Sequence, residues 1–122
     1  MTNRRRAAGL QGEDAAVEQL LSKGYSILHR NWRCRSGELD IVAKQGSMIV
    51  IIEVRARTTG GRFGTAAESV DARKQHQVRT TSEVFLQMNK LHGNHVRFDV
   101  ITVMINRINS EIDEINHIEA AF

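Results

Sequence analysis

The sequence lacks proline altogether and contains only one cysteine, Cys34. A single cysteine excludes an internal disulfide bond and a zinc site built from several cysteines of one chain. The five histidines show no regular spacing of metal ligands, so we do not expect a histidine zinc site either. Metal chemistry in this chain would therefore depend on carboxylates.

Long apolar runs are also absent. The longest, residues 48–52, is far shorter than the roughly 20 residues that a membrane-spanning helix requires. A basic start is followed by residues 7–21, where acidic and amide side chains interrupt the apolar pattern, so the segment lacks the core of a signal peptide. We expect no membrane-spanning segment and a cytoplasmic location.

The net charge of +3 hides an uneven distribution along the chain. Residues 1–35 hold seven Lys and Arg against three acids, and residues 55–97 hold eight against three. Residues 36–54 and 98–122 are acidic, with one basic residue against three and five acids. An acidic centre between basic flanks suits an anionic polymer held around a metal site, although runs of charge are more commonly solvated faces.

Apolar periodicity predicts one domain over residues 1–122, with the basic residues 1–6 flexible. Helices are expected at 7–23 and 71–90, and a glycine-rich basic loop at 58–65. The tail, residues 111–122, has isoleucines spaced by three, which leaves helix or strand undecided. The predicted strands are 25–33, 38–43, 48–55 and 96–105. This order predicts an α/β protein with a mixed sheet between helices.

Asp40 and Glu53 are the most informative residues, because they place carboxylates on two neighbouring strands that otherwise look buried. An unpaired buried carboxylate costs several kcal/mol, so Glu53 should face a cation, a metal ion or water. Arg55 shares its parity and projects from the same face of the strand. Two converging carboxylates are hard oxygen ligands suited to Mg²⁺ or Mn²⁺, which would activate water for phosphodiester hydrolysis.

Two further residues are candidates for the same site, each with an alternative interpretation. Glu13 falls on the apolar face of the first helix, where it either points over the sheet as a third acid or pairs with the arginines at 4–6. Lys74, near the start of the second helix, either reaches back over the sheet edge or is a surface lysine. The candidate catalytic set is thus Glu13, Asp40, Glu53, Arg55 and Lys74. Candidate nucleic-acid-binding residues are the flanking arginines Arg33, Arg35, Arg57, Arg62 and Arg73.

Several short motifs together resemble the YraN-like family of small uncharacterised bacterial proteins. These are Gly12-Glu13-x-x-Ala16, Gly24-Tyr25, Asn31-Trp32-Arg33, Gly37-Glu38-Leu39-Asp40-Ile41-Val42, Ile52-Glu53-Val54-Arg55-x-Arg57, Val70 with Lys74, and Val96-Arg97-Phe98-Asp99-Val100. That family is similar to the restriction-endonuclease-like PD-(D/E)xK superfamily, closest to its archaeal Holliday-junction resolvases. The resemblance implies a three-layer α/β/α fold with a central mixed sheet and a divalent-metal nuclease site, in which Asp40 and Glu53 hold the metal.

Two positions depart from the superfamily pattern. Leu39 stands where the motif has proline, a change that removes no ligand. Arg55 stands where the motif has lysine, and arginine cannot lose its proton near neutral pH, although it can hold a phosphate and stabilise charge. Lys74 could take over the lysine role.

Three hypotheses for function follow. The first is a nuclease-like protein that hydrolyses DNA with Mg²⁺ or Mn²⁺, on branched or junction structures, acting as a homodimer. The second is a catalytically inactive nucleic-acid-binding module with the same fold. The third is a structural or protein-interaction subunit, in which Asp40, Glu53 and Arg55 form an internal ion-pair network.

Overall fold

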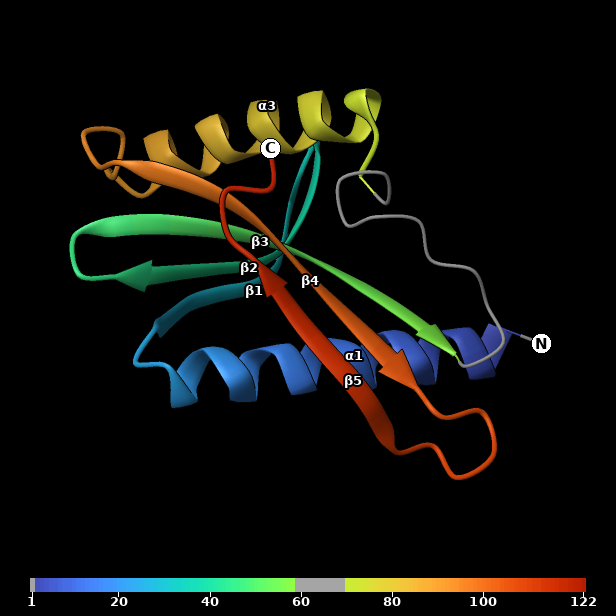
Figure 1. Cartoon of the computed structure of the whole chain (residues 1–122). Helices are drawn as coiled ribbons and strands as arrows, with labels where there is room; N and C mark the ends of the chain where they lie inside the picture. The colour runs from blue at the N-terminus through green and yellow to red at the C-terminus, as the bar shows by residue number, and fades with distance from the viewer. Residues whose placement is uncertain (1, 59–69) are drawn as a thin grey trace.

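A five-stranded sheet lies between two helices in the computed structural model, which describes residues 2–58 and 70–122, with side chains from residue 7 onwards (Figure 1). The elements are α1 (Thr2–Ser22), β1 (Ser26–Cys34), β2 (Gly37–Gln45), β3 (Met48–Thr58), α3 (Ala72–Met88), β4 (Val96–Ile105) and β5 (Ile112–Ile118). No helix in the described part of the chain is long and apolar enough to cross a membrane.

The strands follow one another across the sheet in chain order. All neighbouring strands are antiparallel except β3 and β4, which run parallel because α3 carries the chain back between them. The predicted α/β class with a mixed sheet and helices on both faces is therefore confirmed.

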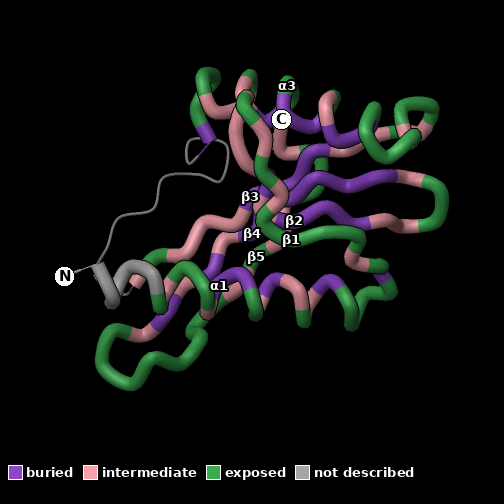
Figure 2. The backbone as a smooth tube through the Cα atoms, turned by 180° about the vertical axis from the view of Figure 1, so that it is seen from behind, coloured by how far each residue is buried: buried purple, intermediate pink, exposed green. Residues whose placement is uncertain are grey.

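Strand β3 is apolar on both parities because both of its faces are covered. Val50 and Ile52 pack in the cluster beneath α1, whereas Ile49 and Ile51 pack in the cluster beneath α3. The buried residues of the sheet are concentrated in its three central strands, β2, β3 and β4, and Figure 2 shows them at the centre of the molecule. Since β3 alternates in this way, Glu53 continues the series that faces α3, and Val54 continues the series that faces α1.

The largest differences from the prediction are at the start of the chain and in its tail. Helix α1 starts at Thr2 rather than near residue 7; the flexibility expected of residues 1–6 stays a prediction. The undecided tail contains a strand, β5, and its Ile115 pairs with Val103 of β4 and packs against the α1 cluster. A spacing of three residues fits a helix as well as a strand, so only the pairing with β4 decided between them.

The sheet divides at the level of Asp40 and Glu53. Pairing between β2 and β3 ends at Ile41 with Ile52, although β1 and β2 stay paired to the hairpin tip and β3 and β4 stay paired to Thr58. The β1–β2 hairpin reaches α3, whereas β3 and β4 continue toward the N-terminal end of α1 (Figure 1). We call this opening between β2 and β3 the fork.

Gly12 sets how closely α1 approaches the sheet. A Cβ atom at this position would lie 2.8 Å from the Cβ of Ala56 on β3. We expect Gly12→Ala to lower the free energy of unfolding by about 1–3 kcal/mol, because the helix must move away from β3. Gly9→Ala is the matched control: its Cβ meets nothing within 4 Å, so it should stabilise the helix by about 0.5–1 kcal/mol. Urea denaturation of both variants measures the difference; equal stabilities would contradict the close packing.

Candidate active site

Asp40 lies at the base of the fork, where β2 leaves β3. Its Oδ2 accepts a hydrogen bond of 2.9 Å from the backbone N–H of Val54. Burial raises the pKa of Asp40 despite this bond and despite the positive charge of Lys74, and the negative charge of Glu13 raises it further. The positive charge around Asp40 therefore does not offset the cost of burying its carboxylate.

Glu53 is only 1% exposed and lies across the fork from Asp40. Its Oε1 is 3.5 Å from Nζ of Lys74, whereas its Oε2 has no hydrogen-bond partner in the described part of the chain. Burial, followed by the charge of Asp40, raises the pKa of Glu53 to about 7, against the opposing effects of Lys74 and Arg55. The two carboxylates therefore repel each other, with Glu53 almost fully removed from water and Asp40 half-buried.

Lys74 reaches Glu53 from the first turn of α3. Asp71 caps that helix, because its Oδ1 accepts a 2.9 Å hydrogen bond from the backbone N–H of Lys74. This cap fixes the start of α3 above β3, so that the lysine side chain extends back over the sheet. The structure thus supports the first of the two interpretations considered for Lys74.

Arg55 is on the same face of β3 as Glu53, two residues further along the strand. Its Nε is buried and has no hydrogen-bond partner among the described residues. Glu53 Oε2 and Arg55 Nε are two of the three buried side-chain atoms left without a partner in the described chain. Such atoms are rare in folded proteins and commonly mark a place where a ligand or ion completes the bonding.

Glu13 lies on α1, faces the fork and is 8% exposed. Its Oε1 accepts hydrogen bonds from Nε of Arg30 at 3.0 Å and Nδ2 of Asn31 at 2.9 Å. The alternative partners at residues 4–6 have side chains outside the described part. Its charge raises the pKa of Asp40, so the structure brings this acid close to Asp40.

Arg30 and Asn31 were not among the site residues expected from the sequence, although Asn31 belongs to the Asn31-Trp32-Arg33 motif. Arg30 also pairs with Asp14, at 2.6 Å, and Asn31 has the left-handed conformation, with φ of 53°. Asparagine is among the few residues that tolerate that conformation, but nothing in a single sequence shows where it is used.

A pocket of about 720 Å³ opens within the fork on the α1 side. Its walls come from the N-terminal half of α1 and from the last residues of β3, and Asp40 lies at its base. The lining residues are Gly9, Glu13, Asp40, Val54, Ala56, Arg57 and Thr58. Two of the three acids therefore face one solvent-accessible space.

The proposed nucleic-acid-binding arginines are spread over several elements. Arg33 is exposed and pairs with Glu38 at 3.2 Å, and Arg35 is exposed at the tip of the same hairpin. Arg57 lines the pocket and Arg73 is exposed on α3. Arg62, with the rest of the glycine-rich loop, lies outside the described residues.

Comparison with known proteins places the chain in a family. The model of the uncharacterised protein family UPF0102 matches residues 12–103, a segment that contains all five candidate catalytic residues. The chain belongs to UPF0102. A UPF0102 protein of Caldicellulosiruptor saccharolyticus is 42% identical over 97% of this chain and 98% of its own length, and one of Moorella thermoacetica is 49% identical over 88% of each. Membership of a family of small uncharacterised bacterial proteins, expected from the motifs, is confirmed.

In this UPF0102 protein, Asp40 and Glu53 are the two strand carboxylates that could hold a metal ion, and they do not form a closed cage. In the described residues no three acidic, histidine or cysteine side chains form a cluster able to hold a metal. The C=O of Val54 points to the same side of β3 as its N–H, which Asp40 accepts, so this carbonyl also faces the fork. Mg²⁺ commonly binds through one or two carboxylates and completes its shell with water and substrate oxygens. The unpartnered Glu53 Oε2 and the repulsion between Glu53 and Asp40 both fit a divalent cation between them.

The raised pKa of Glu53 predicts how the stability of this UPF0102 protein depends on pH without metal. Between the ordinary value of 4.5 and about 7, the folded protein holds a proton that the unfolded chain has lost, so stability falls as the pH rises through this range. From pH 5.5 to 7.5 in a chelator, we expect wild type to lose about 2 kcal/mol more stability than Glu53→Gln, which has no group to titrate. Urea denaturation at both pH values tests this; parallel losses in the two proteins would contradict it.

Proposed function

We propose that this UPF0102 protein is a divalent-metal-dependent nuclease with a restriction-endonuclease-like fold, and that it hydrolyses phosphodiester bonds in DNA. The observation that carries the proposal is the pair of half-buried Asp40 and buried Glu53, which is short of positive charge where the sheet divides. A pocket opens beside the pair, and Lys74 lies against Glu53. These are the parts that phosphodiester hydrolysis requires.

Asp40, Glu53 and the Val54 carbonyl would hold Mg²⁺ or Mn²⁺. When bound, the ion polarises a phosphoryl oxygen and lowers the pKa of water. Glu13, held by Arg30 and Asn31, faces the same pocket and can accept a hydrogen bond from the attacking water. Lys74 neutralises charge next to Glu53 and can orient the nucleophile.

Arg55 stands where the superfamily motif has lysine, and Lys74 is the candidate to replace that lysine. Arg55 can stabilise charge but cannot act as a base. The contact between Lys74 and Glu53 supports the proposal that the lysine role has moved from β3 to α3. An inactive nucleic-acid-binding module is the second candidate, favoured by the substitution at residue 55 itself.

A structural ion-pair network fits the observations less well. In such a network the cations would outweigh the cost of burial and lower the pKa of each carboxylate. The pKa of both Asp40 and Glu53 is instead raised, and burial is the largest cause for each. Taking one charge away should therefore not destabilise the metal-free protein.

The experiment that tests the proposal is titration of wild type with Mg²⁺ and Mn²⁺ by calorimetry, beside cleavage assays on linear, nicked and four-way-junction DNA. Metal binding with metal-dependent cutting supports a nuclease, and the comparison of substrates tests the preference for branched DNA. Metal binding without cutting favours the binding module. Absence of metal binding would contradict the site. The homodimer and the cytoplasmic location stay predictions.

Lys74→Ala provides the test of the lysine role. We expect cleavage to fall at least about a hundredfold, because the charge beside the reacting groups is lost, while Mg²⁺ affinity changes little or rises. His76→Ala, two residues further along α3 and exposed, is the matched control and should retain most activity. Full cleavage by Lys74→Ala would contradict the assignment.

A further inference from the structure

The last part of β3 presents an open strand edge inside the fork. Backbone N–H groups of alternate residues point to the same side of a strand. The N–H of Val54 points toward β2, where Asp40 accepts it, and the N–H of Ile49 points the other way and donates to His95 O at 2.8 Å, next to β4. The N–H groups of Ala56 and Thr58 therefore share the side of Val54 and face the fork.

No described strand covers this edge. Pairing of β2 with β3 ends at Ile52, whereas pairing with β4 on the opposite side continues to Thr58. Ala56 and Thr58 also line the pocket, which begins at Asp40 and Glu13. A row of backbone donors thus leads away from the candidate metal site along one wall of the pocket.

The opposite wall is open at Gly9. A Cβ atom at Gly9 would meet nothing within 4 Å, whereas one at Gly12, a turn further along α1, would collide with Ala56. The helix is therefore pressed against β3 at Gly12 and leaves the pocket free at Gly9. The absence of a side chain at residue 9 keeps the space available to a ligand.

We propose that this groove, between Gly9 on α1 and the open edge of β3 at Ala56 and Thr58, binds a single unpaired DNA strand. The backbone N–H groups would donate to phosphates next to the one held at Asp40 and Glu53, as backbone amides do in many protein–DNA complexes. A pocket of about 720 Å³ has the size of a small-molecule site, which admits one or two nucleotides and not a duplex. The inference rests on the proposed function and specifies its substrate: DNA with a frayed or splayed strand at the cleavage point.

An extended peptide could pair with the same strand edge by adding a strand. The observations favour DNA, because the groove begins at Asp40, a proposed ligand of a phosphate-bound metal ion that would offset the acids of the lining, and because Arg57 contributes a positive charge. Tighter binding of an unrelated extended peptide than of DNA would favour this alternative.

The test is fluorescence anisotropy with a labelled splayed-arm DNA and with the matching full duplex, in Ca²⁺, which takes the same kind of oxygen ligands. Wild type should bind the splayed-arm DNA at least tenfold more tightly than the duplex. Gly9→Leu fills the groove and should abolish this preference, while Gly9→Ala should keep it. Thr58→Pro removes one N–H from the open edge and should weaken splayed-arm binding several-fold, whereas Thr58→Ala keeps the N–H and should bind like wild type.

The inference is overturned if Gly9→Leu binds both DNAs as wild type does, or if an unlabelled extended peptide displaces the splayed-arm DNA from wild type and binds more tightly than the DNA. Circular dichroism melting of Gly9→Leu confirms that the variant is folded. This result is separable from the proposed function. If wild type shows the groove-dependent preference for splayed-arm DNA but no metal-dependent cutting, the nuclease proposal fails and the groove proposal stands. If wild type and Gly9→Leu cut DNA equally well, the nuclease proposal stands and the groove proposal fails.

Discussion

Asp40→Asn should abolish metal-dependent cleavage and weaken Mg²⁺ binding by at least about a hundredfold, without destabilising the metal-free protein. Replacement of one outer partner of a metal ligand already costs 10–100-fold in affinity, so loss of a direct ligand's charge should cost more. Asparagine can still accept the hydrogen bond from Val54 N–H through its side-chain oxygen. It also removes the charge whose burial is unfavourable, so the melting temperature should stay equal or rise.

The combination of lost activity and retained stability separates a metal site from a structural ion pair. Asp113→Asn, an exposed aspartate of β5, is the matched control and should leave metal binding and cleavage unchanged. Calorimetry, a cleavage assay and a melting curve on the same preparations give all three quantities. A stability loss of several kcal/mol in Asp40→Asn, with DNA cleavage intact, would contradict the proposal.

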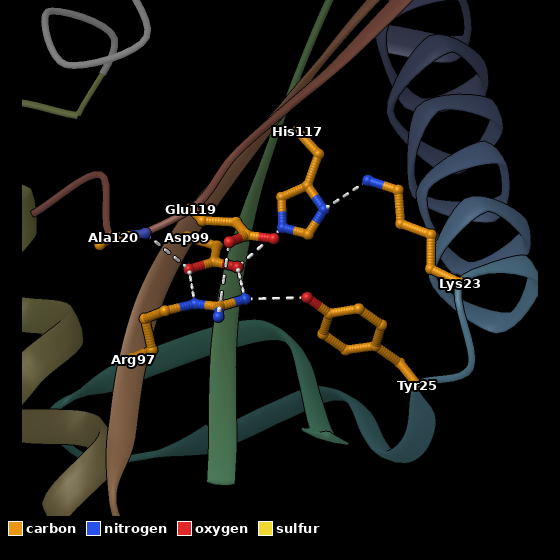
Figure 3. A network of polar contacts seen from close by, with 7 residues as sticks. All are labelled: Lys23, Tyr25, Arg97, Asp99, His117, Glu119 and Ala120. Carbon is orange, nitrogen blue, oxygen red and sulfur yellow. Dashed lines mark hydrogen bonds and ion pairs between the residues drawn. The ribbon is translucent and has the colours of Figure 1, made fainter. Parts of the chain in front are cut away.

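Asp99→Ala should destabilise the protein by about 3–5 kcal/mol. Asp99 is fully buried on β4 and accepts two hydrogen bonds of 2.8 Å from Arg97 and one of 3.0 Å from the N–H of Ala120 (Figure 3). His117 Nε2 lies 2.7 Å from Asp99 Oδ2. Alanine would leave these donors buried without an acceptor.

The loss is large because the Asp99 network joins four segments. Figure 3 shows Arg97 also donating to the hydroxyl of Tyr25, at 2.8 Å, and His117 facing Lys23 at the end of α1. A small domain has a total stability of about 5–15 kcal/mol, so the variant should be largely unfolded in modest urea. Glu119→Ala, whose side chain is 58% exposed and 3.7 Å from Arg97, should cost less than about 1 kcal/mol. Similar urea midpoints for the two variants would show that the network contributes little.

Lowering the pH should remove the stability that the Asp99 carboxylate contributes. Burial by itself would raise the pKa of Asp99, but the hydrogen bonds from His117, Arg97 and the Ala120 N–H hold it below its ordinary value. A carboxylate with a lowered pKa stabilises the fold above its unfolded value of about 3.9, and this contribution is lost as the pH falls through the lower folded value. The acid dependence of Asp99 therefore has the opposite sign to that of Glu53.

Glu53 and Asp40 could be found from the sequence because each interrupts an apolar strand, where a charge has no ordinary place. Glu13 and Lys74 were harder to assign to the site, because helical periodicity shows which face of a helix a residue is on but not which element lies opposite that face. Arg30 gave no signal, because an arginine on an exposed strand is unremarkable until Glu13 is seen beside it.

The sequence by itself determined the α/β class, the apolar strands, the two carboxylates that interrupt them and the family, because these depend on periodicity and on the identity of neighbouring residues. Only the tertiary structure decided that residues 112–118 form a strand, that Lys74 reaches Glu53, that Asp99 joins Arg97 to His117, and that the sheet divides at Asp40. Each of these depends on contacts between segments far apart in the chain. Such contacts follow from which faces the whole set of helices and strands can bury at once, and no local pattern contains that information.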